Sequence, residues 1–597
     1  MLAPNAAAFH SVEAQFMESL RKGATTVPAS KDAYCSRLKA LAADCADELG
    51  LAAGQLEFLL DDFNLGKNYS VIRKATNGWN KRLSDLSPSF SGRPRVVVLL
   101  PDGQAIRAFL RTDACPKIAQ WSDLFLLSPF DIADDIQCIG PNTTFMPIPM
   151  IRRTRFDMMV GYLGYLQTRS PTSLRFAARL EENLQKALAA GTRLDNSLRV
   201  WQIAAGLRSD SQYLNAYSWS LRLFANIFSL GEITRLLRRL QPDLVVNSSA
   251  VSWPSRLWTR AAALEGIPLV SNVISWDNMS TKTLLDEFVD TFLIWSEEMD
   301  TDFKTSVPFL REKPRVIVGT PQFEPIIQQR GLMSRAGFFG PYGLDPNKKL
   351  ILYTTGSKTL FPREADCLDA VLEHWREHLA ERANIMVRMH PKDRHGRYAT
   401  LVTKFPEVPF TLAGKNLAYG DDWLPSEQDI ELLVNQLNHC DVVVNVASTM
   451  TLEGFAIDKP AINIGFTLGP SISARYPMDD YYKSRHYCDV VDTGAARLVN
   501  DYAELFAAID DVLDRNVFDI EKQRRVLRMK CSYLNDSSDR INTFLQNYAA
   551  TRIRSLPIRL THWYASRASA SGMQAMRRLS RAGNFLGRGL RRDRTKR

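Results

Sequence analysis

The sequence predicts an α/β protein with two doubly wound, mostly parallel sheets. Short β-branched runs such as 95–100 (RVVVLL) and 441–446 (DVVVNV) have the length and character of strands buried on both faces of a parallel sheet. Helical patterns separate these runs, and strand–helix alternation is typical of parallel sheets with helices on both faces. The alternation occurs before and again after the Gly/Pro-rich stretch 337–346, which predicts two such units.

The first unit is expected to span 93–330 and to contain a helical insertion. Residues 151–240 lack strand patterns, and 175–188 has helical periodicity. Residues 1–92 are polar and mostly helical in pattern, which predicts a helical N-terminal extension. The strands expected in this unit are 95–100, 123–127, 243–247, 267–274, 289–295 and 315–319, and further helices are expected at 104–110, 218–240 and 252–265.

The second unit is expected to span 331–550, and a basic amphipathic tail, 551–597, follows it. The buried strand 441–446 leads directly into a helix at 451–457. The other expected strands are 349–354, 384–389 and 461–464, and the other expected helices are 364–380, 428–438, 501–515 and 521–548.

The composition narrows the class of protein. Apolar residues make up 45% of the chain and charged residues 23%, which is ordinary for a globular protein. The eight cysteines are scattered without a CxxC pair, which argues against a disulfide framework or a zinc site and fits a reduced compartment. The N-terminus lacks the layout of a signal peptide, and no run of 18 or more apolar residues occurs. We therefore expect a cytoplasmic protein without a transmembrane helix.

Positive charge is concentrated in the tail. Residues 552–597 contain thirteen Lys or Arg and one acid, Asp593, so they carry +12, whereas the whole chain carries +10 and the remainder therefore −2. Apolar side chains, including Trp563 and Tyr564, are interleaved with the basic ones, a pattern typical of helices on an anionic membrane surface. We expect peripheral attachment to the inner membrane face. A disordered tail without a fixed partner and a nucleic-acid-binding tail, which we consider unlikely, are the alternatives.

The stretch 441–465 (DVVVNVASTMTLEGFAIDKPAINIG) carries the most informative functional pattern. A buried strand ends at Val446, and a short turn with Ser448 and Thr449 leads into a helix. The first N–H groups of a helix lack intrahelical partners and lie at the positive end of its dipole, so with the two hydroxyls they form a predicted phosphate site. Glu453 lies about one helical turn further, where its carboxylate would reach a ribose diol. An ordinary helix cap and a solvent-facing glutamate are the alternatives.

This stretch resembles the donor site of GT-B glycosyltransferases, closely that of the bacterial transferases that add N-acetylglucosamine to lipid-linked muropeptide. As in those transferases, a proline, Pro460, follows the glutamate by seven residues. The resemblance implies two Rossmann-like domains that face each other across a cleft, with Glu453 on the ribose hydroxyls and the turn on the phosphates. The sequence departs from the pattern at Val446 and Ala447, which occupy the place of a Gly-Gly pair.

A second pattern lies at the end of the strand 384–389. It reads MVRMHP and presents Arg388 and then His390, which is followed by proline. This resembles the His-Pro motif of bacterial sialyltransferases and CDP-glycerol glycerophosphotransferases, and the resemblance implies that His390 contacts the donor phosphate. A structural ion pair for Arg388 and a simple strand end at His390 are the alternatives.

A third pattern follows the strand 349–354. The glycine and hydroxyls of Thr355, Gly356 and Ser357 suit a loop that faces a diphosphate, although any strand-to-helix turn has this composition. In the first unit, 275–282 (SWDNMSTK) is similar to strings in surface-polysaccharide transferases and glycerophosphotransferases.

The resemblance implies a metal-independent transferase without a bound cofactor. It would move a sugar from a UDP-, CDP- or CMP-linked donor to a surface glycan or lipid-linked acceptor, and His390 would help to stabilise the leaving diphosphate. Inverting transfer needs a general base, and because 93–330 contains no histidine, the expected base is Asp102 or Asp277. A retaining mechanism needs no such base and stays open. The alternative functions are a CDP-glycerol-type glycerophosphotransferase, a nucleotide-sugar 2-epimerase and a non-catalytic membrane or nucleic-acid adaptor.

Overall fold

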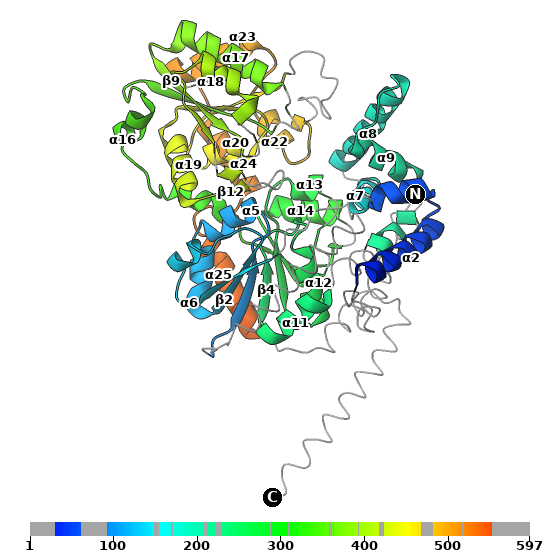
Figure 1. Ribbon diagram of the computed structural model, residues 1–597. Helices are drawn as coiled ribbons and strands as arrows, with labels where there is room; N and C mark the ends of the chain where they lie inside the picture. Colours follow the sequence, from blue (N-terminus) through cyan, green and yellow to red (C-terminus); the bar gives the residue numbers. More distant parts are fainter. Residues whose placement is uncertain are drawn as a thin grey trace, which may run out of the picture.

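Two parallel β-sheets, each covered by helices, form the body of the protein (Figure 1). The structure, a computed structural model, describes the chain between residues 30 and 551. Within that range it leaves out 61–91, 149–154, 169–170, 208–211, 214, 221–229, 283–284, 287, 308–309, 358–360, 362, 392, 394, 413, 417–422, 467–480 and 516. The predicted membrane-binding tail, 551–597, therefore lies outside the described residues apart from its first one.

The first sheet has seven parallel strands in the order β3-β2-β1-β4-β5-β6-β7. From β1 the chain adds β2 and β3 on one side, and it then returns to add β4 to β7 on the other side. The position between β1 and β4 is therefore a topological switch point, which is where ligands bind in open α/β sheets. Strand β3 was not predicted, because TTFMP offers no continuous apolar run. The strands are β1 Arg95–Leu99, β2 Asp123–Ser128, β3 Thr143–Pro147, β4 Leu244–Asn247, β5 Leu269–Asn272, β6 Thr291–Ile294 and β7 Arg315–Ile317.

The second sheet has six parallel strands in the order β10-β9-β8-β13-β14-β15. Its switch point lies between β8 and β13, which are adjacent. The predicted donor-binding segments 355–357 and 448–453 follow these two strands. The outer strands β10 and β15 were not predicted, because each has only three residues. The strands are β8 Lys349–Thr354, β9 Ala383–Met389, β10 Phe410–Leu412, β13 Val442–Asn445, β14 Ala461–Ile464 and β15 Arg497–Val499, and the pair β11 Lys415–Asn416 and β12 Trp423–Leu424 stands apart.

Helices flank both sheets as the alternating pattern predicts. Those that belong to the first sheet are α5 Gly103–Ala105 with the π-helical turn η2 Ile106–Leu110, α6 Ala114–Trp121, α11 Leu230–Leu240, α12 Arg256–Leu264, α13 Asn278–Thr281 and α14 Glu297–Ser306. Those that belong to the second sheet are α17 Glu364–His374, α18 Ala399–Lys404, α19 Glu427–His439, α20 Thr449–Phe455, α22 Cys488–Asp492 and α23 Tyr502–Asp510. The short helices α15 Glu324–Ile327 and α16 Arg335–Phe339 lie between the two sets. Within the described ranges, every helix is too short or too polar to span a lipid bilayer.

The end of the described chain crosses back to the first sheet. The single helix predicted at 521–548 is two helices, α24 Ile520–Lys530 and α25 Ser537–Thr551. Helix α25 packs beside α6, where Trp121 Nε1 donates to Asn542 Oδ1 at 2.7 Å. The crossing runs over Gly319, whose added Cβ would lie 2.1 Å from the carbonyl oxygen of Ser532. The predicted span 331–550 therefore assigns α25 to the second unit, whereas its packing partner lies in the first.

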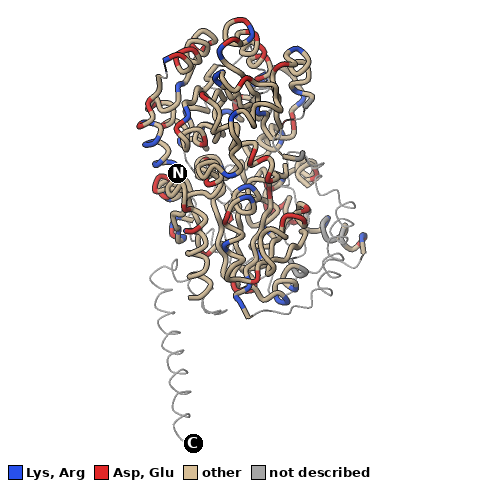
Figure 2. The backbone as a smooth tube through the Cα atoms, turned by 90° about the vertical axis from the view of Figure 1, so that its left-hand side faces the viewer, with Lys and Arg blue, Asp and Glu red and all other residues tan. Residues whose placement is uncertain are grey.

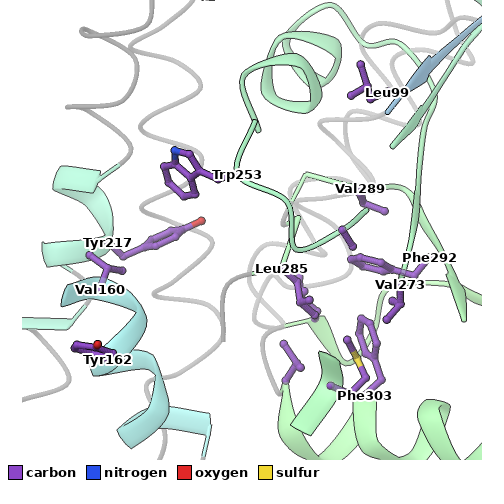
Figure 3. Close-up of a cluster of buried hydrophobic side chains, with 14 of the residues drawn as sticks. Leu99, Val160, Tyr162, Tyr217, Trp253, Val273, Leu285, Val289, Phe292 and Phe303 are labelled. Atoms are coloured by element: carbon purple, nitrogen blue, oxygen red, sulfur yellow. The ribbon is translucent and has the colours of Figure 1, made fainter. Parts of the chain in front are cut away.

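The described parts of the N-terminal extension and of the insertion are helical, and they form a layer beside the first sheet (Figure 1). The two segments interlock, since Trp219 Nε1 donates to Glu48 Oε2 at 2.7 Å. Figure 3 shows Trp253, which precedes α12, beside Tyr217 of the insertion, within one buried apolar cluster. The helices are α2 Lys31–Leu49, α3 Ala53–Leu60, α7 Arg155–Thr168, α8 Pro171–Ala189 and α9 Asn196–Gly206.

The carboxyl ends of the two sheets face each other. Trp276, which follows β5, donates from Nε1 to Thr449 Oγ1, which follows β13, at 3.3 Å. Arg111, in the turn after η2, donates to the carbonyl of Pro425 at 2.9 Å. The largest buried apolar cluster continues from the first sheet to Phe455 of α20, so the junction between the units is part of the core. Figure 2 shows that positions of basic and acidic residues are interspersed along the backbone of both units.

Candidate active site

The turn from β13 into α20 places Glu453 at the junction of the two sheets. Its side chain is 1% exposed, and neither carboxylate oxygen accepts a hydrogen bond from the residues that the structure describes. Arg107, from η2 of the first unit, brings its Nη2 to 3.0 Å from Oε1. The alternative of a solvent-facing glutamate is therefore wrong. A buried carboxylate without hydrogen bonds is costly, so this position invites hydrogen-bond donors from a ligand.

Buried hydrogen bonds fix the shape of the turn. Thr451 Oγ1 lies 2.9 Å from the hydroxyl of Tyr487 and accepts from Asn463 Nδ2 at 3.0 Å. Ser448 is the N-cap of α20, and its hydroxyl accepts from the amide of Met450 at 3.1 Å. The cap that the sequence allows for Ser448 is thus present, and a phosphate contact at this turn stays a prediction.

Arg388 lies in the same electrostatic cluster as Glu453. It is buried at the end of β9, and its Nη1 donates to Gln436 Oε1 at 2.7 Å. Burial lowers the pKa of Arg388 to about 10, and the charge of Arg107 acts in the same direction, whereas Glu453 opposes it. Arg388 is therefore charged at neutral pH. The structure thus brings together the predicted pair Arg388 and Glu453 with an arginine that the sequence did not single out.

His390 is half-buried at the end of β9, beside the loop that follows β8. Its backbone amide donates to Thr355 Oγ1 at 2.8 Å. This hydrogen bond ties the two predicted donor-binding segments together through the backbone. A contact between the His390 side chain and a donor phosphate stays a prediction.

The loop of Thr355, Gly356 and Ser357 rests on the buried side chains of Glu364 and Arg397. The amide of Gly356 donates to both oxygens of Glu364, at 3.0 and 2.8 Å. Arg397 donates to the carbonyl of Gly356 at 3.0 Å. Glu364 therefore occupies the amide of Gly356, and a contact of this loop with a diphosphate stays a prediction.

The glycine at 356 is required by space. A Cβ added there would lie 2.3 Å from the ring of Phe361 and 2.4 Å from a methyl group of Val446. We expect Gly356→Ala to lower the free energy of unfolding by about 1–3 kcal/mol, the usual cost of overpacking. Denaturant unfolding checks this, with Gly396→Ala as the matched control, because an added Cβ at Gly396 meets no atom within 4 Å. Equal effects of the two substitutions would contradict it.

Asp102 and Asp277 follow two strands of the first sheet. Asp102 is the N-cap of α5 and accepts from the amide of Ala105 at 2.8 Å. Asp277 accepts from Thr281 Oγ1 at 3.1 Å. Burial opposes the ionisation of Asp277, but the charges of Lys282 and His486, together with hydrogen bonds from Ser275 and Thr281, hold the pKa of the carboxyl below its ordinary value. Both carboxylates stabilise local turns, and a role as general base stays a prediction for each.

The second unit supplies a histidine to this edge of the first sheet. His486 Nδ1 lies 2.9 Å from Ser280 Oγ, and its ring stands edge-on to Trp276. Burial lowers the pKa of His486 to about 4, so it is neutral at physiological pH. No sequence pattern predicts this placement, since more than 200 residues separate the partners. Within the described ranges, no three His, Cys, Asp or Glu side chains are arranged to hold a metal ion.

Two doubly wound parallel sheets that face each other with their carboxyl ends have the architecture of the GT-B fold. The predicted fold class is therefore confirmed. The predicted candidates Glu453, Arg388, His390 and Thr449 lie at the facing edges, together with Arg107.

No protein-family model matches the chain. Two curated relatives are each 27% identical over 266 residues, which are 44% of this chain and 67% of the relative. Both are UDP-N-acetylglucosamine–N-acetylmuramyl-(pentapeptide) pyrophosphoryl-undecaprenol N-acetylglucosamine transferases, from Lacticaseibacillus casei and Lacticaseibacillus paracasei.

Solved structures of similar fold include an epimerase and a polymerase. UDP-GlcNAc 2-epimerase from Neisseria meningitidis covers 76% of this chain and 100% of its own, with a TM-score of 0.45 and 10% identity. The wall teichoic acid polymerase TagF covers 84% of this chain and 98% of its own, with a TM-score of 0.42 and 11% identity.

Proposed function

We propose that this protein is a glycosyltransferase that takes a sugar from a nucleotide-activated donor. The observation that carries the proposal is the buried carboxylate of Glu453, whose oxygens accept no hydrogen bond within the described chain. A ribose diol has the two donors that such a carboxylate needs. Arg107 and Arg388 lie beside it, and guanidinium groups suit the phosphates that follow the ribose in a nucleotide.

The sequence similarity supports the same class of donor. The relatives from Lacticaseibacillus are named for transfer of N-acetylglucosamine from its UDP-linked form. A sugar nucleotide of this kind combines the ribose and the diphosphate that Glu453 and the two arginines fit. The resemblance carried by 441–465, which is to the same class of transferases, leads to the same donor site.

The finer features of the reaction belong to the proposal. The acceptor is a surface glycan or a lipid-linked glycan, and the basic tail 551–597 holds the enzyme at the inner membrane face. Ser357, Ser448 and Thr449 supply hydroxyls to the diphosphate, and His390 stabilises it as it leaves. Asp102 or Asp277 accepts the acceptor proton if the transfer inverts the anomeric carbon.

A nucleotide screen tests the proposal. Purified protein is heated with UDP, CDP, GDP, ADP or CMP, because a ligand that binds the folded state raises the unfolding temperature. A shift with one nucleotide identifies the donor class, and release of that nucleotide from its sugar-linked form in the presence of a lipid-linked acceptor then measures transfer. No shift with any of the five nucleotides would contradict the proposal.

A CDP-glycerol-type glycerophosphotransferase is the second candidate, because His390 and Pro391 directly follow β9 at the facing edge. It would respond to CDP and would transfer glycerol phosphate in place of a sugar. A nucleotide-sugar 2-epimerase would convert the free sugar nucleotide without any acceptor. The same purified protein, given each substrate in turn, separates the three.

A further inference from the structure

Arg107 is an arginine of the first unit whose charged end contacts Glu453 of the second. Its Nη2 is 3.0 Å from Glu453 Oε1, and its side chain is 17% exposed. Neither this nitrogen nor either oxygen of Glu453 takes part in a hydrogen bond within the described chain. The two charges therefore meet without the aligned geometry of a strong guanidinium–carboxylate pair. Such a contact balances charge while leaving the carboxylate open to better hydrogen-bond donors.

Two arginines, Arg107 and Arg388, and two acids, Glu453 and Asp429, carry the charges around this contact. Arg388 is close enough for the two guanidinium groups to repel each other, and both depend on Glu453. Asp429 is the other acid that acts on Arg388, but its carboxylate already accepts from the amide of Ser426 at 2.8 Å in the cap of α19. An anion placed between the two arginines would relieve their repulsion.

The backbone that carries Arg107 is docked against the second unit. A Cβ added at Gly103 would lie 2.3 Å from the carbonyl oxygen of Trp423, so the absence of a side chain permits this close approach. Arg111 anchors the other end of the segment through its 2.9 Å hydrogen bond to Pro425. The backbone position of Arg107 relative to the second unit is therefore fixed by contacts on both sides of it, at Gly103 and at Arg111.

We propose that Arg107 and the ribose of the donor exchange places at Glu453, and that the displaced guanidinium then binds the donor diphosphate beside Arg388. This inference rests on the proposed function and names the ligand class more narrowly, as a nucleoside diphosphate. In the empty protein Arg107 balances the carboxylate. When the donor binds, the two ribose hydroxyls donate to Glu453, and both arginines face phosphate oxygens. The first unit thereby contributes directly to donor binding.

The exchange predicts opposite effects on two ligands. Arg107→Gln removes a phosphate partner, so the Kd for UDP or CDP rises at least tenfold. The same substitution removes the group that competes with ribose, so the Kd of the matching nucleoside, uridine or cytidine, stays equal or falls. Calorimetric titration of wild type and variant with the nucleoside diphosphate and with its nucleoside measures both effects.

A matched control separates this exchange from loosening of the junction. Arg111→Gln removes the arginine that anchors the same segment through Pro425 and that also pairs with Asp135, while the side chains of Arg107 and Glu453 are retained, so it measures what a loosened junction alone does to binding. Its Kd for the nucleoside diphosphate is expected to change less than threefold. If Arg107→Gln does not fold, Arg107→Lys is used, because it keeps the charge without the forked geometry. This substitution is expected to raise the Kd of the nucleoside diphosphate but not that of the nucleoside.

The outcomes are distinguishable. Wild type that binds UDP or CDP, together with an Arg107 variant that binds them equally well, overturns the inference and leaves the proposed function intact. A loss in Arg111→Gln as large as that in Arg107→Gln also overturns it, because the junction alone would then explain the effect. Wild type that binds no nucleotide contradicts the proposed function and, with it, the inference.

Discussion

Replacement of Glu453 by glutamine is expected to weaken nucleotide binding by about 10- to 100-fold without destabilising the empty protein. Hydrogen bonds to a charged group contribute about 1.5–3 kcal/mol, and each 1.4 kcal/mol is a tenfold change in affinity. In the empty protein the carboxylate accepts no hydrogen bond within the described chain, so the substitution removes a buried charge and no hydrogen bond. Arg107, at 17% exposure, can then turn to water.

Two readouts distinguish this role from a structural one. Thermal unfolding without ligand is expected close to the wild-type temperature, because Arg388 loses the favourable charge of Glu453 but keeps its hydrogen bond to Gln436, whereas the shift caused by the bound nucleotide is lost. Glu427→Gln is the matched control, because it removes an acid of the same type that is 51% exposed and lies at the junction beside Arg111. A Glu453→Gln variant that keeps the full nucleotide-dependent shift would refute the ribose contact.

The local part of this site was predictable from the sequence, because one contiguous segment carries it. A β-branched run, a hydroxyl-bearing turn and a helix place Glu453 on the first turns of α20 by backbone geometry alone. The partners that define its environment come from elsewhere. Arg107 lies on the first sheet, and Tyr487, which holds the turn, is 36 residues further along the chain from Thr451. No periodicity relates such positions, so packing alone brings them together.

The same distinction explains the errors in the fold. Helical periodicity correctly predicts that 537–548 is helical, but it contains no information about which sheet the helix covers. The Asn542 side chain accepts a hydrogen bond from Trp121, which lies more than 400 residues earlier in the chain. The loop of Gly356 was predicted from its composition, but its support by Glu364, eight residues later, was not. A carboxylate in a helix offers no sign that it will be buried beneath the preceding loop.

That buried carboxylate leads to a pH-dependent prediction. Burial raises the pKa of Glu364 from the ordinary 4.5 to about 8, against the opposing charge of Arg397. Between these two values the folded protein keeps a proton that the unfolded chain has lost. The stability of wild type is therefore expected to fall as the pH rises from about 4.5 to about 8, and to be independent of this group above and below that window. Glu364→Gln resembles the protonated form and should remove this part of the slope.

Denaturant unfolding at pH 5, 6.5 and 8 measures how the free energy of unfolding depends on pH. Hydrogen exchange of the amides in 350–372 serves as the probe, so that only unfolding of the second unit is followed. The matched control is Asp366→Asn on the same helix, an acid that is 51% exposed and paired with Arg363, and it should keep the wild-type slope. Glu364→Ala leaves the amide of Gly356 without an acceptor, so it should cost about 1–3 kcal/mol more than the glutamine variant and increase exchange at that amide. If the free energy of unfolding depends on pH equally in wild type and Glu364→Gln, Glu364 is ionised in the folded protein. The loop of the proposed donor site would then rest on an ion pair between Glu364 and Arg397 and not on a neutral acid.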